Sequence, residues 1–340
     1  MPAMDGPFLR ACRLEKSSPT PVWFLRQAGR YMPEYRKVRA KVSFPKLCRD
    51  PGLCAEVAVT AQRRLGVDAA IVFSDILLVL EPLGFRLEYA PGGPKILNPV
   101  RRPSCLKRLR EADPAALAFI AEAVKATRAA LPSDIPLIGF SGAPFTLASY
   151  AIEGGSSRNF QKTKAFLYRH PEAWNELLGM ISRALIGLLQ AQATAGAQAL
   201  QLFDSWVGCL SPSDYRARVL PHTRRILRTL PRGVPVIHFG TSTGGLLEAM
   251  RDAGGDVIGL DPTVSMAEAR RRLGPKVAVQ GNLDPCVLFS DRRTIRREAR
   301  RILAEAGGRG HIFNLGHGVL PTTPVDNVRA LVDFVHEATT

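Results

Sequence analysis

The stretch "ALQLFDS", residues 199–205, decides the fold class of this chain. Four of its first five residues are apolar, and the run then ends in the polar pair Asp204 and Ser205. It is too short for a helix of ordinary length and carries almost no polar interruption. A run of this kind is typical of a strand buried on both faces, which is the situation of strands in parallel sheets.

Seven further runs of the same kind occur along the chain, each followed by a segment with helical periodicity. The eight runs are "PVWFL" (21–25), "AAIVFSD" (69–75), "PLIGFSG" (136–142), "ALQLFDS" (199–205), "VPVIHFG" (234–240), "DVIGLD" (256–261), "KVAVQGN" (276–282) and "HIFNLGH" (311–317). Strands that alternate with helices predict a parallel sheet covered by helices. Eight such units favour a closed (β/α)8 TIM barrel over an open sheet. The first run is not followed by G-x-G-x-x-G, which weakens a dinucleotide-binding alternative.

The pattern predicts a single barrel domain over residues 1–340, with an N-terminal extension at 1–20. The segment 80–112 is expected to make an excursion after the second strand, as a hairpin. Four Asp-Pro pairs mark expected helix starts, because Asp can cap a helix and Pro fits its first turn. They lie at 50–51, 113–114, 261–262 and 284–285, so helix capping is the expected role of Asp261 and Asp284.

The 340 residues carry a net charge of +16, with a pI near 10.1. This balance favours a polyanionic partner: nucleic acid, acidic lipid or a small molecule. The arginine-rich segment 291–301 is interpreted as the solvated face of a helix. The six cysteines include no C-x-x-C pair, as expected of free thiols in a reducing compartment. No apolar run reaches the ~18 residues of a membrane span, so we expect a cytoplasmic protein without a membrane partner.

In (β/α)8 barrels the active site lies at the carboxyl ends of the strands. The polar and aromatic residues at those ends are Arg26, Gln27, Ser74, Asp75, Ser141, Phe203, Asp204, Ser205, His238, Asp261, Asn282 and His317. Asp75 follows a fully apolar strand and precedes no Pro, so a site role is favoured over a structural one. His238 is at least as well explained as a core histidine, and His317 lies between two glycines at the last strand end.

Five basic residues gather after the first run: Arg26, Arg30, Arg36, Lys37 and Arg39. The arginine fork matches carboxylates, so this cluster predicts a substrate with several carboxylate groups. No lysine lies within a predicted strand except Lys276 at a strand start, which argues against Schiff-base chemistry. No close His or Cys spacing suggests a metal site, and none is expected.

Five longer motifs resemble the uroporphyrinogen decarboxylase family: "WFLRQAGRYMPEYRKVR", "DAAIVFSDIL", "GFSGAPFTLASYAIEGGSS", "LFDSW" and "NLGHGVLPTTPVDNV". The likeness runs from about Val22 to the C-terminus. It implies a cofactor-free (β/α)8 barrel, commonly a homodimer. The implied reaction converts the four acetate side chains of uroporphyrinogen to methyls, giving coproporphyrinogen. Two departures, "LVLEP" after Leu77 and Pro262 after Asp261, concern loop shape.

The resemblance also implies a set of site residues. It assigns Arg26, Gln27 and Arg30 to the substrate pocket and Arg39 to a further basic position, with Asp75 receiving the pyrrole N–H groups. The other implied pocket residues are Tyr150, Phe203, Ser205 and His317. Burial would raise the pKa of Asp75, and arginines and N–H donors would lower it and keep it ionised. Arg26 with a carboxylate or water, Tyr150 and His317 all stay open as proton donors.

Two rival interpretations are less favoured. A zinc-dependent corrinoid methyltransferase would have Cys soon after the fifth-strand histidine, where this chain has "HFGTSTGG". A basic porphyrin-binding or nucleic-acid-binding protein would interleave aromatics with its basic residues. Only 7% of the residues are aromatic, mostly within predicted strands, so no nucleic-acid partner is expected.

Overall fold

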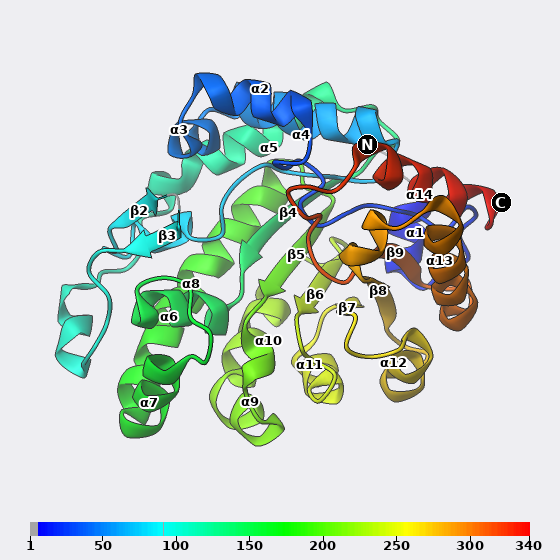
Figure 1. The fold of residues 1–340 in the computed structure, drawn as a ribbon. Coiled ribbons are helices and arrows are strands. Elements are labelled where there is room, and N and C mark those ends of the chain that lie inside the picture. The colour runs from blue at the N-terminus through cyan, green and yellow to red at the C-terminus, as the bar shows by residue number, and fades with distance from the viewer. Residues whose placement is uncertain (1–5, 91) are drawn as a thin grey trace.

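The computed structural model describes residues 6–90 and 92–340 as an α/β fold around a curled parallel sheet (Figure 1). Seven strands are hydrogen-bonded in the order β1-β4-β5-β6-β7-β8-β9. They are β1 (Ala70–Ile71), β4 (Leu137–Gly142), β5 (Ala199–Asp204), β6 (Val236–Gly240), β7 (Val257–Gly259), β8 (Ala278–Leu283) and β9 (His311–Leu315). Six lie within predicted apolar runs, β8 extends one residue beyond its run of 276–282, and every adjacent pair is parallel.

Helices form an arc around the outside of the sheet (Figure 1). They are α1 (Pro7–Cys12), α2 (Pro33–Lys41), α3 (Phe44–Arg49), α4 (Pro51–Leu65), α5 (Ala118–Ala130), α6 (Pro144–Glu153), α7 (Gln161–Arg169), α8 (Pro171–Thr194), α9 (Pro212–Arg218), α10 (Leu220–Thr229), α11 (Leu247–Ala253), α12 (Met266–Leu273), α13 (Arg292–Ala306) and α14 (Val325–Glu337). Short 3₁₀ helices are η1 (Leu78–Leu80), η2 (Pro103–Arg108), η3 (Pro114–Leu117), η4 (Val207–Cys209) and η5 (Pro285–Phe289). The arc closes on itself because α4 packs against both α5 and α14.

The first apolar run, residues 21–25, does not form the expected strand. It makes one isolated parallel bridge, Val22 to Phe313 of β9, so the continuous ladder holds seven strands and not eight. The reason lies in its backbone amides, of which only Trp23 N donates to a strand carbonyl, Phe313 O, at 3.3 Å. Carbonyls of the run do accept ladder-like bonds, from Phe313 N to Pro21 O and from Asp68 N to Val22 O, both at 2.8 Å.

Side chains take the other amides of this run, which we call the seam segment. The three bonds are Val22 N to Asp68 Oδ2 at 2.7 Å, Phe24 N to Gln27 Oε1 at 3.1 Å and Leu25 N to Asn314 Oδ1 at 3.2 Å. Asp68 also meets His336 of α14, with Nε2 to Oδ2 at 2.7 Å. That contact raises the pKa of His336 and links the last helix to the seam segment.

The expected excursion at 80–112 contains an antiparallel hairpin of β2 (Leu87–Ala90) and β3 (Gly93–Ile96), outside the main sheet. Residues 1–5 of the expected N-terminal extension lie outside the described residues, and α1 follows with Phe8 and Leu9 buried in the core. Within the described part of the chain, no helix combines the length and the apolar character needed to cross a membrane.

The predicted caps are correct where the partner is local. Asp50, Asp113 and Asp284 accept backbone amides at the starts of α4, η3 and η5. The prediction for Asp261 is wrong, because α12 begins later and is capped by Ser265. The Asp261 carboxylate instead accepts the backbone amide of Ser242 and the hydroxyl of Thr263.

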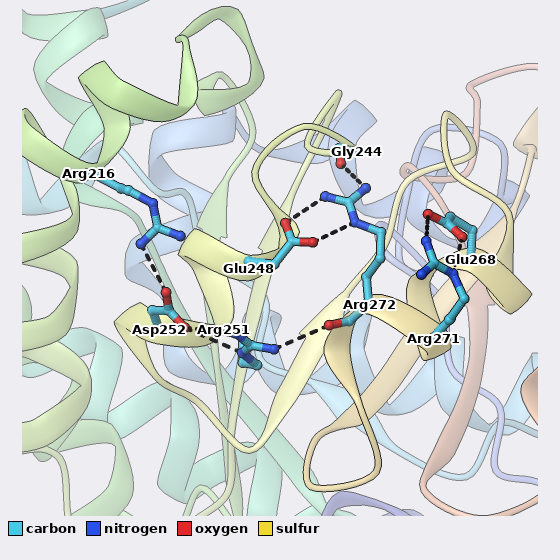
Figure 2. Close-up of polar contacts among 8 residues, drawn as sticks. All are labelled: Arg216, Gly244, Glu248, Arg251, Asp252, Glu268, Arg271 and Arg272. Carbon is cyan, nitrogen blue, oxygen red and sulfur yellow. Dashed lines mark hydrogen bonds and ion pairs between the residues drawn. The ribbon is translucent and has the colours of Figure 1, made fainter.

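Outside the sheet, a charged network joins α9, α11 and α12 (Figure 2). Arg272 of α12 donates through Nε and Nη2 to both oxygens of Glu248 of α11, at 2.7 and 2.6 Å. Its Nη1 also donates to Gly244 O at 2.6 Å. Arg216 of α9 meets Asp252 of α11 at 2.9 Å. One guanidinium therefore holds two helices and the loop that follows β6.

Candidate active site

A cavity of about 410 Å³ opens at the carboxyl ends of the strands. Six of the predicted site residues line it together: Arg26, Arg30, Asp75, Phe203, Ser205 and His317. Arg26 and Arg30 come from the loop after the seam segment, and Asp75 comes from the turn after β1. Phe203 and Ser205 come from β5 and its end, and His317 follows the end of β9. The parallel strands therefore bring together residues that lie nearly 300 positions apart in the sequence.

Asp75 occupies the turn between β1 and η1. Its Oδ1 accepts the backbone amide of Leu77 at 2.8 Å and the hydroxyl of Tyr89 at 3.2 Å. Burial raises the pKa of Asp75, and this effect exceeds the lowering by the Leu77 amide, Tyr89 and Arg26. Burial is therefore the larger effect on the pKa of this carboxyl group.

Arg26 lies at the end of the seam segment with an unusual backbone. Its φ of +60° is in the left-handed region, which non-glycine residues seldom adopt and which clusters at functional sites. Its side chain is exposed and passes over Gly318, after the last strand. A Cβ atom at Gly318 would lie 2.7 Å from Arg26 Cγ, so only glycine leaves room for this arginine. Arg30, at the other end of the same loop, is also exposed.

Gln27 and Arg39, both predicted for the site, do not line this cavity. The Gln27 side chain is buried, accepts Phe24 N at 3.1 Å and donates to Ala69 O at 3.1 Å. It therefore ties the seam segment to β1. Arg39 donates to a backbone carbonyl at the end of α2, and its guanidinium carbon lies 5.8 Å from the ring centre of Phe44.

Tyr150, on α6, also lies outside the residues that line the cavity. Its ring stacks on Trp206 with 3.9 Å between centroids and an interplanar angle of 28°. Burial, and then the negative charge of Asp75, raise the pKa of Tyr150 to about 12. The hydroxyl thus keeps its proton at neutral pH, and Tyr150 is close enough to Asp75 to feel its charge.

The remaining predicted residues form the aromatic and polar walls. Phe203 packs edge-on against Phe140 and Phe239, with centroids 5.5 and 5.9 Å apart. His317 is exposed at the cavity, and partial desolvation and the charge of Arg26 lower its pKa. Imidazole at this position is therefore mostly neutral at neutral pH.

Two other strand-end residues lie in the core. Asp204 is fully buried, accepts the Thr146 hydroxyl at 2.9 Å, and burial raises its pKa to about 7. Thr146 also receives the Trp206 amide at 3.2 Å, so this pair supports the turn after β5. His238 is fully buried, and burial lowers its pKa to about 4, in agreement with a core histidine.

An aromatic wall contributed by the excursion and its neighbours was missed by sequence reasoning. Tyr35, Phe44 and Phe73 line the cavity, and the ring of Tyr89 of the hairpin packs at a tilt against Phe44, with 5.1 Å between centroids. The position of the hairpin was predictable from its turn residues. No local signal indicated that the hairpin folds back to deliver a hydroxyl to Asp75.

The donor set also bears on metal binding. Across the described residues, no three or more His, Cys, Asp or Glu side chains are grouped to hold a metal ion. The six cysteines are all free thiols. What the cavity offers is one half-buried carboxyl group, two exposed arginines, an imidazole and aromatic walls.

Comparisons with known proteins agree with this arrangement. The chain matches the family described as Uroporphyrinogen decarboxylase (URO-D) over residues 4–338. It is 55% identical to the uroporphyrinogen decarboxylase of Sorangium cellulosum, over 98% of this chain and 96% of the relative. It is 52% identical to that of Carboxydothermus hydrogenoformans, over 98% and 97%.

Among solved structures, a methyltransferase from Methanosarcina mazei superposes with a TM-score of 0.79 over 98% of both chains. Its sequence identity is 19%, so this likeness concerns the fold alone. The family match covers almost the whole chain, and the relatives match along nearly their full lengths. The chain belongs to the uroporphyrinogen decarboxylase (URO-D) family.

Proposed function

We propose that this protein is a uroporphyrinogen decarboxylase that converts the four acetate side chains of uroporphyrinogen to methyls, giving coproporphyrinogen. The observation that carries the proposal is a single cavity in which the half-buried Asp75 lies among exposed Arg26 and Arg30. Family membership supplies the substrate and the reaction. The cavity supplies groups that suit a substrate with eight carboxylates and with pyrrole N–H donors.

The chemistry needs an acceptor for the electron pair of the breaking C–CO₂ bond. Protonation of a pyrrole carbon makes the ring cationic, and the pair flows into that ring as CO₂ leaves. A second proton on the exocyclic carbon then gives the methyl group, and the ring returns its extra proton. Asp75 accepts the pyrrole N–H groups and stabilises the cationic ring by a fixed, preorganised charge.

The arginines bind substrate carboxylates through paired N–H donors. Pyrrole N–H groups that donate to the Asp75 carboxylate favour its charged form, and so they oppose burial, which raises the pKa of Asp75. Arg26 with a carboxylate or water, Tyr150 and His317 remain the candidate proton donors. Burial raises the pKa of Tyr150 to about 12, whereas desolvation and the charge of Arg26 lower the pKa of His317.

The wider assignments are proposals of the same standing. The seam segment acts as the eighth strand of a closed barrel, supported by its carbonyl bonds toward β9 on one side and Asp68 on the other. Residues 1–340 form one domain around one continuous core. A homodimer is proposed from the family resemblance, and a cytoplasmic location from six free thiols.

The test is anaerobic incubation of EDTA-treated protein with freshly reduced uroporphyrinogen, followed by oxidation and separation of the products by carboxylate number. Stepwise loss from eight to four carboxylates supports the proposal and its independence from metals. Bound macrocycle that keeps all its carboxylates would leave a tetrapyrrole-binding protein and overturn the enzymatic role.

Asp75→Asn tests the assigned residue. We expect turnover to fall by about 100-fold or more, because the fixed negative charge is lost, with little change in thermal unfolding. Asp113→Asn is the matched control. It makes the same chemical change at a residue that caps η3, away from the cavity. Turnover of Asp75→Asn within a few-fold of the unchanged protein would contradict the role.

A further inference from the structure

The hairpin of β2 and β3 brings the Tyr89 hydroxyl to the carboxylate of Asp75. We propose that Tyr89 is a positioning residue, whose hydroxyl holds Oδ1 of Asp75 and leaves Oδ2 as the acceptor for the substrate. The proposal rests on the proposed function, since it assigns Tyr89 a part in that same reaction.

The division of labour between the two carboxylate oxygens follows from the contacts. Oδ1 accepts both Leu77 N at 2.8 Å and the Tyr89 hydroxyl at 3.2 Å. No donor among the described residues reaches Oδ2 in a hydrogen bond, and Asp75 lines the cavity. A carboxylate has acceptor capacity on both oxygens, so the unused capacity is on Oδ2. Two donors on one oxygen also fix the plane of the group before the substrate binds.

The position of Tyr89 is itself held from several sides. Its ring packs on Phe44 at 5.1 Å between centroids, and Phe44 packs on Phe73 at 6.2 Å. The hairpin is fastened to the end of α6, because Ile96 N donates to Gly154 O at 2.9 Å. The hydroxyl therefore reaches Asp75 from a docked element and not from a free loop.

Tyr89 remains a proton donor across the working range. Burial, followed by the negative charge of Asp75, raises the pKa of Tyr89 far above its ordinary value. An ionised carboxylate can only accept hydrogen bonds, so the protonated Tyr89 hydroxyl donates to it. This bond stabilises the charged form of Asp75.

Other groups around Asp75 also affect its titration and must be held constant in any test. They are Arg26 from the loop after the seam segment, Glu81 after η1, Cys48 of α3, and Tyr150 of α6. His317 shares the cavity. Arg26 acts on Asp75 by charge, whereas Tyr89 and Leu77 act by direct hydrogen bonds. Of these two hydrogen bonds, only the one from the Tyr89 hydroxyl can be removed by a side-chain change, because Leu77 donates through its backbone amide.

Tyr89→Phe deletes the hydroxyl and keeps the ring. We expect kcat to fall about tenfold with a smaller change in KM, because Oδ1 loses one of its two donors. Loss of a donor to the charged form raises the pKa of Asp75. The acid limb of the pH profile of kcat therefore moves to higher pH, by about one unit. The measurement is the pH–rate profile for decarboxylation of uroporphyrinogen.

Tyr168→Phe is the matched control. Tyr168 is exposed on α7 and donates to Asp214 at 2.7 Å, so the same substitution removes a tyrosine–aspartate bond far from the cavity lining. Its kcat and acid limb are expected to match the unchanged protein.

A double variant separates positioning from packing. If Tyr89 acts through Asp75, adding Tyr89→Phe to Asp75→Asn causes little further loss, whereas a packing defect would cause the same loss in both backgrounds. An unshifted acid limb in Tyr89→Phe, or equal losses in both backgrounds, would overturn the inference. Failure of the unchanged protein to decarboxylate uroporphyrinogen would instead overturn the proposed function.

Discussion

Arg26 shows how one side chain at the site depends on the absence of another. Its left-handed backbone directs the guanidinium side chain over Gly318, where any Cβ would fall within 2.7 Å of Arg26 Cγ. The loop after the first run and the loop after the last strand therefore fit together only with glycine at this position. The arginine is exposed, so its place is set by this fit and not by burial.

Gly318→Ala is expected to lower kcat/KM by about tenfold or more, because Arg26 must leave its position over the cavity. The free energy of unfolding should change by less than about 1 kcal/mol, since an exposed side chain can move aside. Activity assays and urea unfolding of the same preparation measure the two effects.

Gly245→Ala is the control for the glycine change, because a Cβ there meets nothing within 4 Å and its backbone is not left-handed. Activity of Gly318→Ala equal to that of Gly245→Ala would show that Arg26 does not depend on Gly318.

At the scale of elements, α11 and α12 are joined by an ion pair that is stronger in geometry than most surface pairs (Figure 2). Arg272 binds Glu248 through two nitrogens and Gly244 through a third. The hydrogen bonds from Arg272 are the main cause that lowers the pKa of Glu248 to about 2. This pair connects two helices, whereas Arg271 and Glu268 form a pair within α12 alone.

Glu248→Gln is expected to reduce the free energy of unfolding by about 1 kcal/mol at pH 7, a value discounted because the glutamate is more than a third exposed. The pKa of Glu248 is depressed in the folded state, so the stabilisation is present above the ordinary glutamate pKa. It is lost as pH falls from about 4.5 toward about 2. Urea unfolding of both proteins at pH 7 and near pH 3 measures the difference.

Glu268→Gln removes the pair within α12 and is expected to lower the free energy of unfolding less than Glu248→Gln does. If the two variants lose the same stability at pH 7, the link between α11 and α12 adds nothing beyond an ordinary helix pair.

Elements whose formation depends on residues close in the sequence could be predicted from the sequence. The seven strands coincide with apolar runs because a buried parallel strand needs little else, and Asp50, Asp113 and Asp284 cap helices through amides two or three residues away. Asp261 carries the same Asp-Pro signal and accepts bonds from nearby Thr263, yet its other carboxylate oxygen accepts the Ser242 amide of another loop and it caps no helix. A distant partner leaves no trace in local spacing.

The residues of the candidate site likewise include some that the sequence pattern identifies and some that depend on distant contacts. Arg26, Asp75 and His317 could be identified because strand ends converge in this fold class. Tyr89 could not, because its contact with Asp75 depends on how the excursion docks. The family resemblance assigns Gln27 to the pocket, whereas its side-chain amide binds two backbone groups in the interior.

For the whole molecule, a net charge of +16 implies attraction of an eight-fold carboxylate from a distance. We expect kcat/KM for uroporphyrinogen to fall as ionic strength rises from 0.01 to 0.5 M, because the Debye length shrinks from about 30 Å to a few Å. The fall should exceed that of kcat, since encounter and not chemistry is screened.

The reaction supplies its own comparison for the salt effect. Partly decarboxylated substrates with seven to five carboxylates carry less charge, so their kcat/KM should fall less steeply with salt. Equal slopes for all of them would mean that charge does not steer the substrate to the cavity.

The seam segment has a consequence for inherited variation. In a β-ladder the backbone amides donate to backbone carbonyls. A side-chain substitution deletes such a bond only when proline replaces the residue that supplies the amide. Here Val22, Phe24 and Leu25 rely on the side chains of Asp68, Gln27 and Asn314. A substitution that removes the acceptor at any of these three positions leaves a backbone amide without its partner. The seam segment is thus more exposed to missense mutation than the ladder beside it, although it contains no catalytic group of its own.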